Sequence, residues 1–149
     1  MALTTLAIEE SIHIAAAPEI VWRFLAEPRS WQHWWTGCRG AETQDRKTLH
    51  DGSELLLALH LGWMTWKFTV RIGAMTANRS LAWAGKGGGV GSRHAFYLDA
   101  KPNGTFVRQQ ATFSGPGVLF FRLLRLDAAS RRMLHQNLRG LKRAAERAS

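Results

Sequence analysis

The chain contains very little cysteine, tyrosine and proline: its 149 residues include one cysteine, one tyrosine and four prolines. The single cysteine, Cys38, excludes a disulfide within the chain and is typical of a reducing compartment, which predicts a cytoplasmic location. No apolar run reaches the roughly 18 to 20 residues that a membrane-spanning helix needs. The first residues lack the basic segment of a signal peptide and soon reach Glu9 and Glu10. With 46% hydrophobic residues, we expect one globular domain over residues 1–149, without a transmembrane segment.

Acidic residues are also scarce, since 11 of them face 20 lysines and arginines, which gives a formal net charge of +9. Residues 116–149 alone hold eight basic and two acidic residues, so most of the excess lies in one segment. A solvated helix face explains this stripe most simply, and a surface for nucleic acid or anionic membrane is the alternative. Nucleic-acid surfaces usually interleave exposed aromatic rings with the charge. This stripe carries no aromatic residue, so we expect no nucleic-acid partner.

The last quarter of the chain has the clearest helical period. Gly115–Pro116 ends the preceding segment, and proline suits a first helical position. The apolar side of the pattern consists of Leu119, Leu123, Leu126, Leu134, Leu138, Leu141 and Ala145. The basic side consists of Arg122, Arg125, Arg132, Arg139, Arg143 and Arg147. The pattern predicts one long amphipathic helix over 116–148, with its leucines against the rest of the protein.

The residues before this helix read as strands and two short helices. A first strand covers Thr4–Ile14, a short helix begins at Pro18, and a second follows Pro28, where Trp31, Trp34 and Trp35 share one face. Six further runs are separated by turn signals such as Asp51–Gly52 and Asn103–Gly104: 41–50, 53–61, 63–75, 81–84, 92–100 and 105–114. A seven-stranded antiparallel sheet of this size curls. We therefore predict an α+β helix-grip fold, in which the curved sheet surrounds the long C-terminal helix and the two short helices follow the first strand.

Strand alternation identifies the side chains that point inward. Over residues 63–75 one face is wholly apolar: Met64, Trp66, Phe68, Val70 and Ile72. The inward sets of the neighbouring strands are Leu55, Leu57, Leu59 and Leu61; Leu81 and Trp83; His94, Phe96 and Leu98; and Val107, Gln109, Ala111 and Phe113. Asp127, Ser130 and Asn137 fall on the inner arc of the helix. The predicted interior is thus rich in aromatic rings and holds a few polar groups.

Several motifs resemble the START-like helix-grip superfamily (SRPBCC), and within it the polyketide cyclase/dehydrase-like group. They are Ile14-Ala-Ala-Ala-Pro18-Glu-Ile-Val21-Trp22-Arg-Phe-Leu25, then Pro28, Trp31, Trp34 and Trp35, Asn78-Arg79-Ser80-Leu81-Ala-Trp83, Gly104-Thr-Phe-Val107, Phe113-Ser-Gly115, Asn137-Leu138-Arg-Gly-Leu141-Lys142 and Glu146. These motifs span nearly the whole chain in the expected order. The resemblance implies a cavity between the sheet and the C-terminal helix for a hydrophobic small molecule: a polyketide-like aromatic, a lipid or a sterol-like compound.

On this resemblance we expect the ligand to contact the aromatic, aliphatic and polar side chains of the inner surface. They are Trp34, Trp35, Leu57, Leu59, Trp66, Phe68, Val70, Trp83, His94, Phe96, Gln109, Phe113, Leu134, Asn137 and Leu138. A solid core is the alternative, because seven tryptophans also suit plain packing. A second alternative is a polyketide cyclase or dehydratase, in which His94 acts as a catalytic acid or base on the bound ligand. Either protein would be a monomer or a homodimer.

We expect no metal and no cofactor. The six histidines show no ligand spacing, and Cys38 has no second cysteine to pair with as a ligand. The glycine-rich run 85–91 does not fit a phosphate-binding loop, because Lys86 precedes glycine and the run joins two strands. It predicts a mobile hairpin that gates the cavity mouth.

Overall fold

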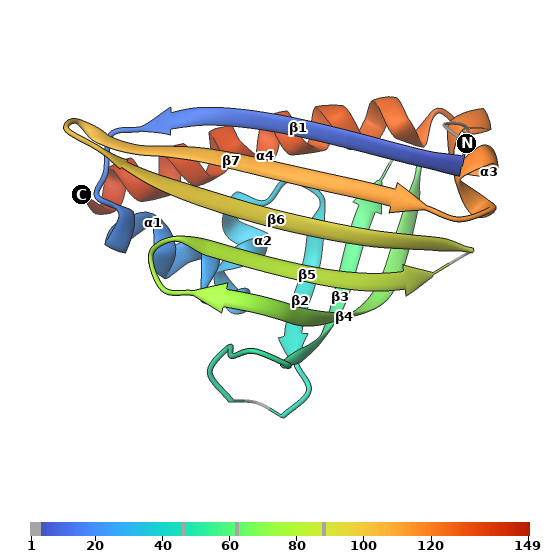
Figure 1. Cartoon of the computed structure of the whole chain (residues 1–149), viewed down its shortest axis with the longest axis horizontal. Coiled ribbons are helices and arrows are strands. Elements are labelled where there is room, and N and C mark those ends of the chain that lie inside the picture. Colours follow the sequence, from blue (N-terminus) through green and yellow to red (C-terminus); the bar gives the residue numbers. More distant parts are fainter. Residues whose placement is uncertain (1–3, 46, 62, 88) are drawn as a thin grey trace.

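One curved sheet and one long helix dominate the molecule (Figure 1). The computed structural model describes residues 4–45, 47–61, 63–87 and 89–149, apart from the side chain of Leu61. The strands are β1 (Thr5–Ile14), β2 (Cys38–Thr43), β3 (Glu54–Leu61), β4 (Met64–Thr76), β5 (Ser80–Gly87), β6 (Val90–Lys101) and β7 (Gly104–Ser114). The helices are α1 (Pro18–Leu25), the 3-10 helix η2 (Pro28–Ser30), α2 (Trp31–Trp34), α3 (Gly117–Leu123) and α4 (Leu126–Ala148). The expectations for Gly88 and for the Leu61 side chain lie outside the described residues.

The sheet is an antiparallel meander closed on one side by the first strand. Its order is β1-β7-β6-β5-β4-β3-β2, so β1 pairs with the last strand in the chain. Bulges between Cys38 and Gly40 and between Ile72 and Ala74 shift the register of β2 and β4, and such bulges bend strands locally. The predicted α+β helix-grip fold is confirmed.

Alternation along the strands also gave the inner face of the sheet correctly. The inward residues of β5, β6 and β7 are all buried, as are Leu55, Leu57 and Leu59 of β3. On β4, Val70 and Ile72 are buried, whereas Trp66 and Phe68 are half-buried and pack against the core. The difference along β4 places its first half at the edge of the core, where the site described below lies.

Helix α4 runs along the concave side of the sheet and is fixed to it at its C-terminal end. Glu146 accepts a hydrogen bond from the Ala15 N–H at 2.8 Å and a second one from Lys142. Lys142 also donates to the carbonyl oxygen of His13 at 3.1 Å. At Gly140 the helix approaches α2 so closely that an added Cβ would overlap the carbonyl oxygen of Trp34. These contacts account for several positions of the C-terminal motif quoted above.

The prediction of one continuous helix over 116–148 is wrong. The segment divides into α3 and α4, and Arg125 between them adopts a left-handed conformation with φ of 60°. The break changes the direction of the chain, so that Leu126 is buried while Leu119 and Leu123 are 49% and 75% exposed. No glycine or proline marks this position, which is why the sequence pattern runs through it.

Two loop boundaries also differ from the prediction. The second strand is Cys38–Thr43 rather than 41–50, because residues 44–45 and 47–53 form no strand before β3 begins at Glu54. The glycine run is mostly strand: Gly85 and Gly87 belong to β5 and Gly91 to β6. A Cβ at Gly85 would lie 2.8 Å from Val70 Cγ1, and one at Gly87 would lie 3.0 Å from Phe68. Glycine thus serves close strand packing here, where it reads as a loop signal in the sequence.

Candidate functional site

A small apolar cavity lies between the sheet and the helices, at the end of the molecule that carries α3. Its volume is about 40 Å³. The wall contains Leu57, Leu59, Trp66, Phe68, Val70, Trp83, Gly87, Val90, Ser92, His94, Phe113, Phe121 and Met133. These residues come from strands β3 to β7 and from both C-terminal helices. The cavity therefore lies where the β3–β4 hairpin, the β5–β6 hairpin, α3 and α4 meet.

The structure brings eight of the expected ligand-binding residues into this wall and leaves seven outside it. Those in the wall are Leu57, Leu59, Trp66, Phe68, Val70, Trp83, His94 and Phe113. Those buried elsewhere are Trp34, Trp35, Phe96, Gln109, Leu134, Asn137 and Leu138. The second group is buried at α2, on the middle of α4 and on the sheet, outside the cavity wall. Whether either group contacts a ligand stays a prediction.

Sequence reasoning missed five residues of the wall: Gly87, Val90, Ser92, Phe121 and Met133. The glycine-rich run predicts a connection over Gly87 and Val90, with Ser92 at the start of the next strand. In the structure these residues belong to β5 and β6 and form one side of the cavity. Phe121 turned inward only because α3 is a separate helix. Met133 could have been found, since it lies on the same helical face as Ser130 and Asn137, three and four residues away.

His94 on β6 stands in the wall among aromatic rings. Its imidazole is stacked on Trp83 with ring centroids 5.5 Å apart and planes inclined by 12°. Phe113 approaches it edge-on at 5.9 Å, and Trp35 lies at 6.3 Å. Trp83 in turn stacks on Trp31 at 5.0 Å. Trp31 of α2 and Trp35, which follows α2, thus pack against Trp83, and Trp35 also contacts His94. These contacts fix the orientation of the Trp83 and His94 rings.

Polar atoms in this wall lack hydrogen-bond partners. Within the described part of the chain, Nε1 of Trp66, Nε1 of Trp83 and Nδ1 of His94 are buried and have no partner. Burial lowers the pKa of His94 to about 4, because a charged imidazolium loses its hydration in this apolar surrounding. The ring is consequently neutral at pH 7. Three residues of the cavity wall thus carry buried polar atoms without a partner: two indole N–H donors and one neutral imidazole.

A second group of buried polar side chains lies under α4, outside the cavity wall. Gln109, Ser130 and Asn137 are each 0% exposed, and their side-chain polar atoms have no hydrogen-bond partner among the described residues. Glu146 and Lys142 fasten helix α4 through hydrogen bonds, whereas the Asn137 side chain does not. Asp127 is half-buried at the start of α4, which has no side-chain cap.

The described residues contain no group of three or more His, Cys, Asp or Glu side chains that could hold a metal ion. Across the same residues, no helix has both the length and the apolar character required to cross a membrane.

Comparison with known proteins assigns the chain to a family. The profile of the family described as polyketide cyclase / dehydrase and lipid transport matches residues 5–146. The chain belongs to this family. No curated protein sequence matches it significantly.

Solved structures share the fold of this polyketide cyclase/dehydrase family member. The Zhui aromatase/cyclase from a Streptomyces species is 17% identical with a TM-score of 0.81, covering 96% of this chain and 94% of that chain. The protein TTHA0849 from Thermus thermophilus is 14% identical with a TM-score of 0.80, covering 97% of this chain and 99% of that chain. The di-domain ARO/CYC StfQ from the steffimycin biosynthetic pathway is 13% identical with a TM-score of 0.74, covering 98% of this chain and 51% of its own. At these identities the likeness establishes the helix-grip fold.

Proposed function

We propose that this protein binds a flat, oxygenated aromatic molecule of the polyketide type in the cavity beside His94. The observation that carries the proposal is the set of unpartnered polar atoms in an otherwise apolar wall, on Trp66, Trp83 and His94. An unpaired buried donor costs about 1–3 kcal/mol. A ligand whose carbonyl or hydroxyl oxygens accept these hydrogen bonds removes that cost, while its rings pack against the aromatic wall.

The same observation ranks the other two ligand classes lower. The chain of a fatty acid or phospholipid has no acceptor along most of its length, so it would leave the indole N–H groups unpaired. A sterol-like compound carries few oxygens, so it would also leave most of these polar atoms unpaired. The structures named as aromatase/cyclases share this fold, which agrees with an aromatic ligand.

Binding requires the cavity to widen. Its volume of about 40 Å³ holds only a few water molecules, whereas pockets for drug-sized ligands measure roughly 300–1,000 Å³. Three side chains of the wall can move to widen the cavity, because Trp66 and Phe68 are half-buried and Met133 has a flexible side chain. We expect these three side chains to move when a ligand enters.

Titration with 1,8-dihydroxyanthraquinone, followed by tryptophan fluorescence and by native mass spectrometry, tests the proposal. We expect saturable binding of one molecule per chain, and weaker binding of oleic acid. Trp83→Phe keeps an aromatic ring but removes the N–H, and should weaken binding about tenfold, as loss of one hydrogen bond does. Trp22→Phe on α1, outside the wall, is the matched control and should bind like the wild type. Tighter binding of oleic acid, or equal affinity of both variants, contradicts the proposal.

A cyclase or dehydratase reaction on the bound molecule is the second candidate, favoured by the position of His94. Its neutral imidazole can polarise a ligand carbonyl by hydrogen bonding, or take the proton from an adjacent enolisable carbon. The enolate carbon then forms a C–C bond to a second carbonyl carbon of the same ligand, and the aldol product loses one water on aromatisation. With a pKa of about 4, His94 is a weak base, so polarisation is its stronger role.

The mass of the ligand after incubation separates the two candidates. A carrier returns the ligand unchanged, whereas an aromatising cyclase returns a product lighter by one water per ring closed. His94→Gln should abolish such turnover while ligand binding persists. Turnover that survives His94→Gln removes this histidine from the mechanism.

A further inference from the structure

The end of the molecule that holds the cavity has an apolar outer surface. Large hydrophobic side chains that are exposed in the described residues are Leu56, Trp63, Tyr97, Leu119, Phe120 and Leu123. Three of them lie on the single short helix α3, where Leu119, Phe120 and Leu123 are 49%, 61% and 75% exposed. Trp63, 68% exposed, lies in the β3–β4 turn, close in sequence to the wall residue Trp66. Leu56 and Tyr97 stand apart on β3 and β6.

Helix α3 is apolar on both of its sides. Its inner side places Val118 and Phe121 in the protein interior, where Phe121 contacts Phe113 at 5.2 Å and lines the cavity. Its outer side presents the three exposed residues to solvent. Arg122 is the one charged residue of α3, and it donates a hydrogen bond to the carbonyl oxygen of Thr5. A clustered exposed apolar surface marks a binding surface.

Positive charge borders this surface. Arg125 follows α3 directly and is exposed, and Lys86 near the end of β5 is exposed as well. Gly89, just before β6, is held against the start of α3 by the hydrogen bond from the Gly117 N–H to its carbonyl oxygen at 3.0 Å. Figure 1 shows α3 and the start of β6 at the same end of the molecule. Asp127 is the nearby acid, and it is half-buried.

We propose that this end of the molecule docks onto the surface of an anionic lipid bilayer. Leu119, Phe120 and Leu123 enter the boundary between headgroups and acyl chains, and Lys86 and Arg125 contact lipid phosphates. A second copy of the chain is the poorer occupant, because a symmetric contact would bring the cations of both copies together. An anionic membrane complements both the apolar surface and its basic border.

Docking has a consequence for the ligand. The cavity lies directly beneath α3, because Phe121 lines it from the inner side of the same helix. A hydrophobic molecule dissolved in the membrane could therefore pass into the cavity without crossing water. This transfer rests on the proposed function, whereas the docking itself does not.

Co-sedimentation with vesicles that contain no added ligand tests the docking alone. Vesicles of phosphatidylcholine with about 30% phosphatidylglycerol should bind the wild type, pure phosphatidylcholine should bind it more weakly, and added salt should reduce binding to the anionic vesicles. Phe120→Ser/Leu123→Ser should lower the vesicle affinity at least about tenfold. The matched control is Leu56→Ser/Tyr97→Ser, which also replaces two exposed apolar side chains and should bind like the wild type. Circular dichroism melts check that both variants are folded.

Three results overturn the proposal: no binding of the wild type to anionic vesicles, equal loss in both double variants, or a wild-type dimer that only Phe120→Ser/Leu123→Ser dissociates. The last result would show that a second copy covers α3. Titration of 1,8-dihydroxyanthraquinone without vesicles is a separate measurement, so failure of the docking and failure of the proposed function give different results.

Discussion

At the scale of single residues, the environment of His94 determines both its charge and its contribution to stability. The stacked Trp83 and the edge-on Phe113 exclude water from the imidazole, and burial lowers its pKa to about 4. A neutral imidazole can donate or accept one hydrogen bond in the cavity wall without introducing charge. Its value in this position is therefore as a polar anchor for an uncharged ligand.

This burial predicts a specific loss of stability in acid. The unfolded chain binds the His94 proton with a pKa near 6.5, whereas the folded chain binds it only near pH 4, so protonation favours unfolding as the pH falls through that window. The free energy of unfolding should decrease by about 3 kcal/mol from this group between pH 7 and pH 4. Urea denaturation of wild type and His94→Gln across that range measures the difference. Equal slopes in wild type and His94→Gln would argue against the assignment.

At the scale of elements, the contact between α4 and α2 depends on one glycine. Helix propensity alone favours alanine over glycine by about 1 kcal/mol in a helix interior. Gly140 is nevertheless required, because the carbonyl oxygen of Trp34 lies where a Cβ would be. The two helices approach here more closely than any larger side chain permits, and this approach holds the α2 tryptophans behind Trp83.

Gly140→Ala should thus destabilise the protein, although alanine has the higher helix propensity. We expect the free energy of unfolding to fall by about 1–3 kcal/mol, as overpacking of a core typically does. Chemical denaturation measures this directly. The control is Gly73→Ala in β4, where an added Cβ meets no atom within 4 Å and the change should stay within about 0.5 kcal/mol. A stabilised Gly140→Ala variant would contradict the close contact.

The elements also show what the sequence could and could not predict. Alternation on β4 and β7 predicted the inner face correctly. On β4 one side carries the charged residues Lys67 and Arg71, so only the other side can face the core. The glycines of β5 led to a wrong prediction of a loop. Their role is to leave space for Val70 and Phe68 of the neighbouring strand, and the local sequence does not show that strand. The break at Arg125 left no sign in the local pattern, since leucines continue at helical spacing on both sides.

The sequence predicted only part of the cavity wall, because it shows the local pattern and not the elements that pack against it. Strand alternation shows which residues face inward, and hence Trp66, Trp83 and His94. It does not show which part of the inner face a helix covers. Phe96 and Gln109 lie on the covered part, and Phe121 reaches the open part only through the break before α4.

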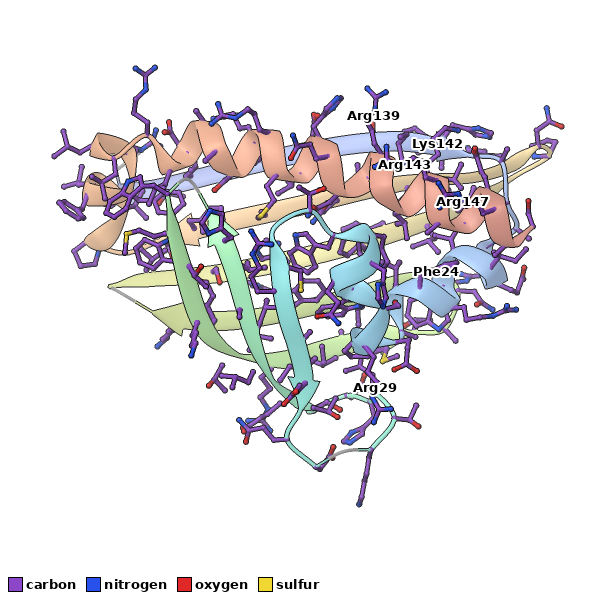
Figure 2. All side chains as sticks on the ribbon, turned by 180° about the vertical axis from the view of Figure 1, so that it is seen from behind. Phe24, Arg29, Arg139, Lys142, Arg143 and Arg147 are labelled. Atoms are coloured by element: carbon purple, nitrogen blue, oxygen red, sulfur yellow. The ribbon has the colours of Figure 1, made fainter. Side chains whose placement is uncertain are left out.

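At the scale of the whole molecule, the C-terminal part of the basic stripe, from Arg139 to Arg147, lies away from the cavity. Figure 2 shows Arg139, Arg143 and Arg147 along the C-terminal half of α4, and all three are exposed. No ion pair joins them to an acidic side chain within the described part of the chain. Lys142, between them, is engaged with Glu146 and His13 and belongs to the framework. This part of the stripe is thus independent of the site.

Neutralising the stripe should leave the protein intact. We expect Arg132→Gln/Arg139→Gln/Arg143→Gln to unfold within about 1 kcal/mol of the wild type, because exposed charges contribute little each. Its affinity for 1,8-dihydroxyanthraquinone should not change. Fluorescence anisotropy with a labelled DNA duplex at two salt concentrations checks the alternative, since nucleic-acid binding falls steeply with salt. A duplex bound by the wild type and released by the triple variant would establish the stripe as a nucleic-acid surface.

The pairing of β1 with β7 has a consequence for how the protein is made. Ile14 of β1 pairs with Thr105 of β7, so β1 is synthesised about 90 residues before the strand with which it pairs. During that time the apolar face of β1, with Leu6 and Ile8, has neither its neighbouring strand nor α4 to cover it. The sheet closes only after β7 has been synthesised, and α4 can settle on it only later still. Completion of the sheet is therefore a late event, because it requires translation of the chain through Ser114.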